Sequence, residues 1–185
     1  MEKKENQRIT LTKRLLQDAL INLLRTTDIS KISIRELCEK AGINRTTFYN
    51  HYGSQYDVLK ELSGNFLADI EAALTNATAT DREEVHKRVG FVFHYIEEHL
   101  EISRILINSS LDPDFPMKLF SIPKINALFE EQLPEDMNQN VRKAAFTYAV
   151  NGSYRLIQEW INQQPRCSAE EEARLILTLS GKVCR

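Results

Sequence analysis

Apolar residues recur at three- and four-residue spacing through most of the chain, which is the period of amphipathic α-helices. A first helix is expected from Thr10 to about Thr26, where leucines repeat along one side. No alternating strand pattern occurs anywhere in the sequence. Further helices are expected in both halves of 33–52, over 54–76, from residue 80, around 99–108, and over 115–132, 137–163 and 168–182. Pro123 should break or kink the helix that contains it. The pattern predicts an all-α protein of roughly nine helices.

The stretch from Ser33 to Tyr52 predicts two short helices separated by a turn. Ser33 and Glu36 form a capping box at the start of the first helix. Gly42 is placed to end that helix in a left-handed conformation, and Asn44 is placed to cap the second. Two helices around such a tight turn form the helix-turn-helix geometry, whose second helix suits a DNA major groove.

The second of these helices carries mostly polar side chains. Only Phe48 and Tyr52 are evident core anchors, and so short a helix gains little from its own propensity. An ordinary helical corner in a bundle is the alternative, but it leaves the polar face unexplained. We therefore expect a DNA contact surface, with Arg45 reading a guanine. Its expected members are Asn44, Arg45, Thr46, Thr47, Tyr49, Asn50 and His51.

The segment LTKRLLQDALINLLRTTDISKISIRELCEKAGINRTTFYNHYGSQYDVL resembles the N-terminal domain of TetR/AcrR-type transcriptional regulators. The resemblance rests on S-I-R-E-L-C-E-K-A-G-I and on T-F-Y-x-H-Y followed by a capped helix. It implies that Arg35 also contacts DNA. Gln55 stands where the family usually has a lysine that reaches a phosphate, and Tyr56 stands where an acidic residue is more usual. Losing that lysine removes a charge-assisted phosphate contact, so Gln55 is expected to be a weak replacement.

A long fourth helix is expected to connect the DNA-binding region to the rest of the chain. Ser54 and Asp57 form a capping box at its start, and an apolar stripe continues to about residue 76. The predicted organisation is a helix-turn-helix DNA-binding domain at 1–53 and a ligand-sensing and dimerisation domain at 54–185. Residues 1–8 show no apolar periodicity and are expected to form a loose arm.

The predicted helix at 137–163 has apolar residues on two sides, so both sides should be buried. Gly152 in its middle suggests the close approach of another backbone. The segment AFTYAVNGSYRLIQEWI is similar to the penultimate helix of many TetR-type regulators, where it and the last helix form a dimeric four-helix bundle. A deeply buried helix of a monomer is the alternative. The expected dimer residues are Tyr148, Gly152, Leu156, Trp160, Leu175, Ile176 and Leu179.

Charge and cysteine content agree with a DNA-binding role inside the cell. Residues 1–53 contain ten Lys/Arg and six Asp/Glu, which gives a charge of +4. Because the whole chain has a net charge of −2, the remaining residues carry −6. A basic end on an acidic protein favours polyanion binding at that end. Three widely spaced cysteines indicate reduced thiols rather than a disulfide framework. With no membrane-length apolar run and no signal peptide, a cytoplasmic protein without a membrane partner is expected.

Enzyme chemistry finds no support in the sequence. The sequence has no G-x-S-x-G, H-E-x-x-H, Gly-rich phosphate loop or C-x-x-C, and its histidines do not converge as metal ligands would. No cofactor and no metal is therefore expected. A helical adaptor that binds protein is a second alternative, although it does not explain the polar second helix of the corner.

The resemblance implies a small-molecule pocket among the C-terminal helices. Ring-rich helices with few charges favour an apolar or aromatic effector. The nominated ligand-binding residues are Phe93, His94, Phe120, Asn151 and Arg155. The expected function is a transcriptional repressor that binds a near-palindromic double-stranded DNA operator as a homodimer and is modulated by such an effector. Control by a protein partner instead of a small ligand remains the alternative.

Overall fold

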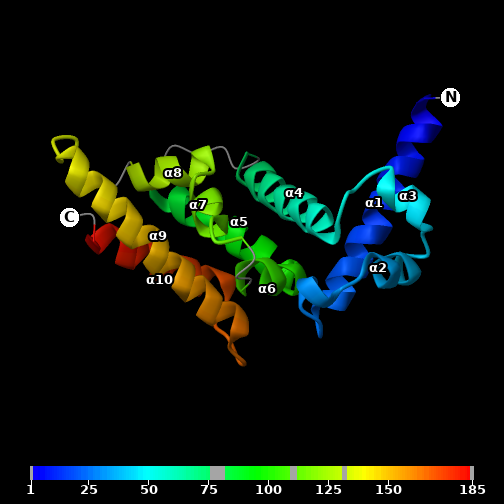
Figure 1. Ribbon diagram of the computed structural model, residues 1–185. Helices are drawn as coiled ribbons and strands as arrows, with labels where there is room; N and C mark the ends of the chain where they lie inside the picture. Colours follow the sequence, from blue (N-terminus) through cyan, green and yellow to red (C-terminus); the bar gives the residue numbers. More distant parts are fainter. Residues whose placement is uncertain (1, 76–81, 109–111, 131–132, 184–185) are drawn as a thin grey trace. The chain divides into compact units, whose positions relative to one another are not determined.

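A computed structural model describes residues 2–75, 82–108, 112–130 and 133–183 of the chain (Figure 1). Within these ranges the secondary structure is helical and includes no strand, which confirms the all-α prediction. The elements are α1 (Glu2–Leu24), the 3-10 helix η1 (Ile29–Lys31), α2 (Ile34–Ala41), α3 (Arg45–Tyr49), α4 (Gln55–Thr75), α5 (Arg82–Glu98), α6 (Leu100–Asn108), α7 (Phe115–Phe120), α8 (Pro123–Glu130), α9 (Gln139–Asn162) and α10 (Ala169–Val183). The expected break at Pro123 is confirmed, since α8 begins there.

The N-terminus differs from its prediction, because α1 begins at Glu2 instead of Thr10. The loose arm expected over 1–8 is therefore wrong for the described residues of that segment. Glu, Lys, Gln and Arg all have high helix propensity and extend a helix that is anchored farther on by the buried Leu16 and Leu20. A segment without an apolar stripe is not expected to be buried, but it can still be helical.

The chain forms two compact units, residues 1–66 and 67–185, and α4 contributes to both. The first half of α4 belongs to the N-terminal unit, where Glu61 pairs with Lys13 of α1. The domain boundary predicted at residue 53 stays a prediction; the compact unit extends past it because Val58 and Leu62 of α4 are buried in its core.

The core of the N-terminal unit comes from the apolar stripes that the sequence predicts. Leu16, Leu20, Leu37 and Phe48 are fully buried or nearly so, and they come from α1, α2 and α3. Because one aliphatic or aromatic side chain contributes about 1.5–3 kcal/mol when fully buried, these contacts hold the short α2 and α3 in place. Tertiary packing, more than helix propensity, stabilises helices this short.

The C-terminal unit packs α9 against α6, α7 and α10, and α5 against α10. Trp160 of α9 is 1% exposed, with the ring of Phe93 of α5 at 5.3 Å between centroids. The start of the fifth helix, expected at Thr80, lies outside the described residues; α5 is described from Arg82.

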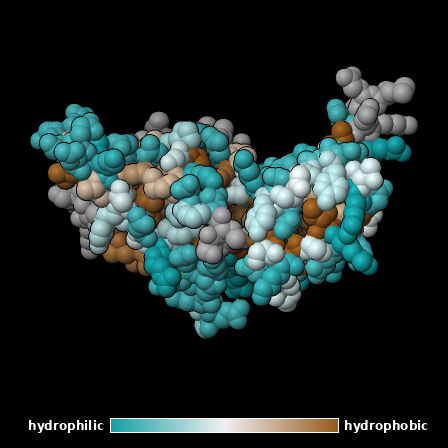
Figure 2. Space-filling model, in the orientation of Figure 1, coloured by the Kyte–Doolittle hydropathy of each residue, from teal (hydrophilic) through white to brown (hydrophobic). Residues whose placement is uncertain are grey.

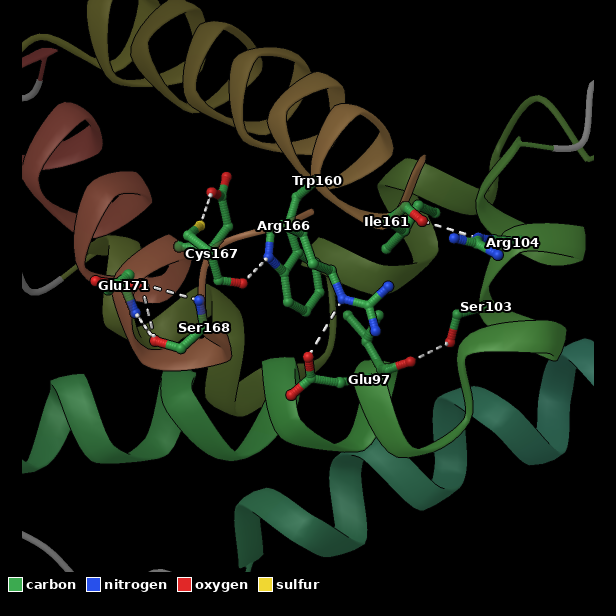
Figure 3. Close-up of polar contacts among 11 residues, drawn as sticks. Glu97, Ser103, Arg104, Trp160, Ile161, Arg166, Cys167, Ser168 and Glu171 are labelled. Atoms are coloured by element: carbon green, nitrogen blue, oxygen red, sulfur yellow. Dashed lines mark hydrogen bonds and ion pairs between the residues drawn. The ribbon is translucent and has the colours of Figure 1, made fainter. Parts of the chain in front are cut away.

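The turn between α9 and α10 is fixed by polar contacts (Figure 3). Trp160 Nε1 donates to Cys167 O at 3.0 Å, and Arg166 Nε lies 3.2 Å from Glu97 Oε1 of α5. The Arg166 guanidinium also lies 5.7 Å from the Trp160 ring centroid. Arg104 of α6 donates to the carbonyl of Ile161 at 2.8 Å. The α9–α10 hairpin is thus attached to α5 and α6 at one end.

Candidate nucleic-acid interface

The corner between α2 and α3 has the geometry that its sequence predicts. Ser33 Oγ accepts from the Glu36 N–H at 3.1 Å, which caps α2. Gly42 follows α2 with φ 67° and ψ 27°, the left-handed region that glycine adopts at least cost. Asn44 Oδ1 accepts from the Thr47 N–H at 2.7 Å and so caps α3. Neighbouring residues therefore define where α2 begins and ends and where α3 begins.

Phe48 fixes which side of α3 faces outward. Its side chain is fully buried and makes edge contacts with Tyr49 at 5.5 Å and tilted contacts with Tyr52 at 5.8 Å between ring centroids. The opposite side of α3 remains open, with Tyr49 58% exposed and Arg45 exposed as well. Thr46 and Asn50 are also exposed, whereas Thr47 and His51 are half-buried.

Three of the nominated DNA-binding residues have partners within the protein. The side-chain oxygen of Asn44 accepts the hydrogen bond that caps α3. Arg35 of α2 is exposed and pairs with Glu39, with 2.7 Å between Nε and Oε1. Gln55 is half-buried, and its amide nitrogen donates to the carbonyl of Ile29 at 3.4 Å. Arg35 remains accessible to a phosphate because an exposed ion pair of this kind is weak, whereas Gln55 is directed into its own unit.

Asp57 occupies the backbone donors at the start of α4. Its Oδ2 accepts from the N–H groups of Gly53 and Ser54, at 3.0 Å and 2.8 Å. The capping function predicted for Ser54 and Asp57 is thus present. These two N–H groups therefore have a carboxylate partner within the chain.

Sequence reasoning missed a cluster that positions the corner. Lys13 Nζ of α1 lies 2.9 and 3.0 Å from the two carboxylate oxygens of Glu61 of α4, and 5.6 Å from the ring centroid of Tyr52. Burial and the neighbouring Glu61 carboxylate raise the pKa of Tyr52 well above its usual range. Tyr52 is therefore a neutral anchor at the end of the corner. No local sequence pattern predicts this cluster, because its members are far apart in the chain.

The C-terminal unit encloses an apolar cavity of about 60 Å³. Of the nominated ligand residues, Phe93 and Phe120 line it. Its lining comes from α4, α5, α7, α8, α9 and α10: Leu74, Val89, Val92, Phe93, Leu119, Phe120, Ile125, Leu128, Phe129, Ile157, Ile176, Leu177 and Ser180. Ser180 is the polar side chain of this lining, and its Oγ lies 3.4 Å from that of Ser153. The helical spacing of apolar residues predicted that aromatic rings would line a pocket here, but it did not predict that Ser180 would line it as well.

The three polar residues nominated for the ligand do not line this cavity. His94 lies one residue past Phe93, turns away from it, and pairs with Glu170 of α10. Asn151 and Arg155 lie on the exposed side of α9, where Asn151 donates to the Thr147 carbonyl at 2.8 Å. Arg155 pairs there with Glu159 at 3.1 Å. These residues belong to outer helix faces because the buried side of α9 is occupied by Val150, Tyr154 and Ile157.

The nominated dimer residues divide into exposed and buried sets. Tyr148 is 67% exposed, Gly152 is exposed and Leu156 is half-buried. On α10, Leu175 and Leu179 are 44% and 43% exposed. Trp160 and Ile176, in contrast, are buried within the C-terminal unit, and their nomination for an intersubunit surface stays a prediction. Figure 2 shows hydrophobic surface in the region of α9 and α10.

Two kinds of site were not found among the described residues. No three His, Cys, Asp or Glu side chains within the described ranges gather in a way that could hold a metal ion. A search of the same ranges finds no helix with the length and hydropathy that a membrane span requires.

Solved structures with the same fold are transcription regulators. A TetR transcriptional regulator from Streptococcus agalactiae 2603V superposes with a TM-score of 0.76 at 21% identity over 100% of both chains. The dihydroxyacetone kinase operon activator DhaS gives 0.64 at 17% identity, covering 94% of this chain and 96% of its own. The fatty acid degradation regulator FadR from Bacillus halodurans gives 0.63 at 15% identity, covering 92% and 94%. At these identities the likeness establishes the fold.

Related sequences match both the N-terminal and the C-terminal parts of the chain. An uncharacterised helix-turn-helix transcriptional regulator of Bacillus subtilis strain 168, YxbF, is 32% identical over 166 residues, 84% of this chain. The chain spans 41% of the length of that relative. Residues 16–62 match the tetR family of bacterial regulatory proteins, and residues 83–182 match a transcriptional regulator C-terminal region of the TetR type. With an exposed polar helix held in a capped helix-turn-helix corner and family matches over both units, the chain belongs to the TetR family of transcriptional regulators.

Proposed function

We propose that this chain represses transcription by binding a near-palindromic operator as a homodimer in the cytoplasm, and that a small apolar effector releases it. The observation that carries the proposal is the exposed face of α3. Phe48 is buried beneath α3 while Arg45, Thr46, Tyr49 and Asn50 remain exposed above it. A short helix with its buried anchor on one side and exposed polar side chains on the other suits a major groove.

Within this face, Arg45 is proposed to specify a base. It is exposed at the first position of α3, and residues near the start of a recognition helix reach base edges. A guanidinium can donate two hydrogen bonds to guanine O6 and N7. Tyr49, Arg35 and the hydroxyl of Thr46 would then serve the phosphates, which position the protein without specifying sequence.

Binding to fragmented genomic DNA at low and high salt tests the DNA-binding proposal. The wild-type protein should retain specific fragments at the higher salt, whereas a helical adaptor should retain none. Arg45→Ala should weaken binding to the retained fragment by about 1–3 kcal/mol and relax preference at one base pair. Lys87→Ala, which removes an exposed charge from α5, is the matched control. Unchanged affinity in both Arg45→Ala and Tyr49→Ala would contradict the orientation of α3.

Homodimerisation is proposed through the exposed sides of α9 and α10. Ser153 and Ser180 face each other between the two helices, and Leu177 and Glu170 of α10 face the cavity and α5. Leu175 and Leu179 are left on the outer side of α10. An exposed apolar surface on two adjacent helices favours a second copy, as in the bundle that the resemblance implies.

The effector proposal rests on the apolar cavity. At about 60 Å³ it is far smaller than ligand sites of roughly 300–1,000 Å³. An effector must therefore push apart the helices that line it. These include α9 and α10, which carry the proposed dimer surface, and α4, whose first half belongs to the DNA-binding unit. A ligand that binds the expanded state more tightly lowers DNA affinity by that difference in affinity.

A panel of small uncharged aromatic and aliphatic compounds tests this step. Release of a bound operator fragment, together with a rise in the melting temperature of the DNA-free protein, would support the effector proposal. If a broad panel produces neither release nor a thermal shift, the effector is contradicted and control by a protein partner is favoured.

A further inference from the structure

The outer side of α9 alternates small and large side chains at four-residue spacing. Ala144, Tyr148, Gly152 and Leu156 follow one another along a single row, which we call the α9 row. Residues four apart form the main ridges of a helix surface. Tyr148 is 67% exposed, and a Cβ placed on Gly152 meets no atom within 4 Å apart from its chain neighbours and the backbone of its own helix. The row therefore presents a projecting ring one turn away from an empty notch.

A groove runs beside this row. It is lined by Asn140, Ala144, Tyr148 and Gly152 on one ridge and by Lys143, Thr147 and Asn151 on the next. A groove between two such ridges accepts the corresponding ridge of another helix at a crossing angle of about −50°. The ridge that fits must offer a bulky group opposite Gly152 and a small one opposite Tyr148. The α9 row itself has these groups.

We propose that two copies of α9 cross antiparallel at the midpoint between Tyr148 and Gly152, with the Tyr148 ring of each copy seated over Gly152 of the other. The inference rests on the proposed homodimer and specifies its register. A two-fold axis at this midpoint pairs Tyr148 with Gly152 and, farther out, Leu156 with Ala144, so each large side chain meets a small one. A parallel arrangement would oppose the two Tyr148 rings and leave a void at Gly152.

Shape and continuity favour a second copy over another partner. The α9 row supplies both the large and the small side chains that the contact needs. Leu175 and Leu179 of α10 extend the apolar surface beside the contact.

The register is tested by moving the bulky group from one position to the other. Gly152→Tyr should raise the dimer dissociation constant at least about thirtyfold, because two rings then compete for one space. Combining it with Tyr148→Ala places a bulky and a small group opposite each other again, and most of the lost affinity should return. Sedimentation gives the dissociation constant, and circular dichroism confirms helicity. A double variant that dimerises no better than Gly152→Tyr alone would overturn the register.

A crosslinking experiment avoids bulky substitutions. Mixing Tyr148→Cys protein with Gly152→Cys protein and adding a short bis-maleimide should crosslink the mixture beyond either variant alone, with wild type as the blank for its own cysteines. Equal crosslinking in the mixture and the separate variants overturns the register. A wild-type monomer at micromolar concentration would contradict the proposed homodimer itself, whereas a wild-type dimer indifferent to all these changes contradicts the register only.

Discussion

At the scale of single residues, Gln55 is held by a contact within the N-terminal unit. Its amide nitrogen donates to the Ile29 carbonyl instead of pointing outward. Asp57 meanwhile occupies the N–H groups of Gly53 and Ser54. These donors at the start of α4 therefore have partners within the N-terminal unit.

Replacing Gln55 should reveal the missing phosphate contact. Gln55→Lys should tighten operator binding and steepen the dependence of log affinity on log salt by about 1, because one more phosphate is neutralised. Fluorescence anisotropy between low and moderate salt measures both. Gln55→Met, similar in length but uncharged, is the control and should leave the salt slope unchanged. Identical slopes for the lysine and methionine variants would mean that position 55 does not approach DNA.

Glu172 carries a buried carboxyl group that affects stability as a function of pH. Its residue is 6% exposed, and burial raises the carboxyl pKa above its usual 4.5. A raised folded-state pKa means that the stability contribution is fully present below the unfolded-state pKa and is lost as pH rises through the folded-state pKa. Glu172→Gln should therefore raise the melting temperature at pH 7 by about 2–4 °C, the effect of about 1 kcal/mol in a chain of this size.

Glu170, on the same helix, supplies a control of opposite sign. A backbone hydrogen bond at its own position and the His94 side chain lower its pKa, so its contribution is present above pH 4.5 and is lost as pH falls through the lowered folded-state pKa. Glu170→Gln should lower the melting temperature near pH 6, and this effect should shrink as pH falls below 4.5. Thermal melts of both variants between pH 4 and pH 8 make the comparison. The same pH trend in both would contradict the assignment of Glu172 as a buried carboxylate.

At the scale of elements, the turn between α2 and α3 depends on one backbone conformation. Gly42 has φ 67°, and no atom lies within 4 Å of a Cβ placed there. Any effect of a substitution therefore comes from the backbone and not from a clash. Gly42→Ala should destabilise the protein by about 1–2 kcal/mol and weaken DNA binding, because α3 would lose its orientation.

Gly64→Ala is the matched control for this element. Gly64 lies inside α4, has equally open space around its Cβ position and lacks a positive φ. Alanine there should stabilise the protein by up to about 1 kcal/mol through helix propensity. Urea unfolding of both variants measures the difference. Two changes of the same sign would contradict the left-handed turn as the reason for Gly42.

At the scale of the whole molecule, the proposed dimer predicts the form of its operator. Two recognition helices related by a two-fold axis should contact half-sites about 10–10.5 base pairs apart, or a multiple of that spacing. Inserting about 5 base pairs between the half-sites turns them to opposite faces of the duplex and should abolish tight binding, whereas inserting about 10 should restore part of it. Electrophoretic mobility shifts measure this. Affinity independent of the insertion would contradict simultaneous binding of both half-sites.

Sequence alone determined the features that depend on local chemistry. The helical period gave the all-α class, Gly42 and Asn44 marked the corner, and Pro123 marked the break between α7 and α8. Such signals can be recognised because each involves residues within a few positions of one another.

Tertiary structure decided the features that depend on residues far apart in the chain. It paired Lys13 with Glu61, directed Gln55 toward Ile29 and buried Trp160 inside the C-terminal unit. Periodicity showed that α9 is apolar on two sides but could not show which side meets the same chain, because that depends on where α6, α7 and α10 pack. Likewise, Ser180 lines the cavity because of how the surrounding helices pack, and the residues next to it in the sequence do not predict this.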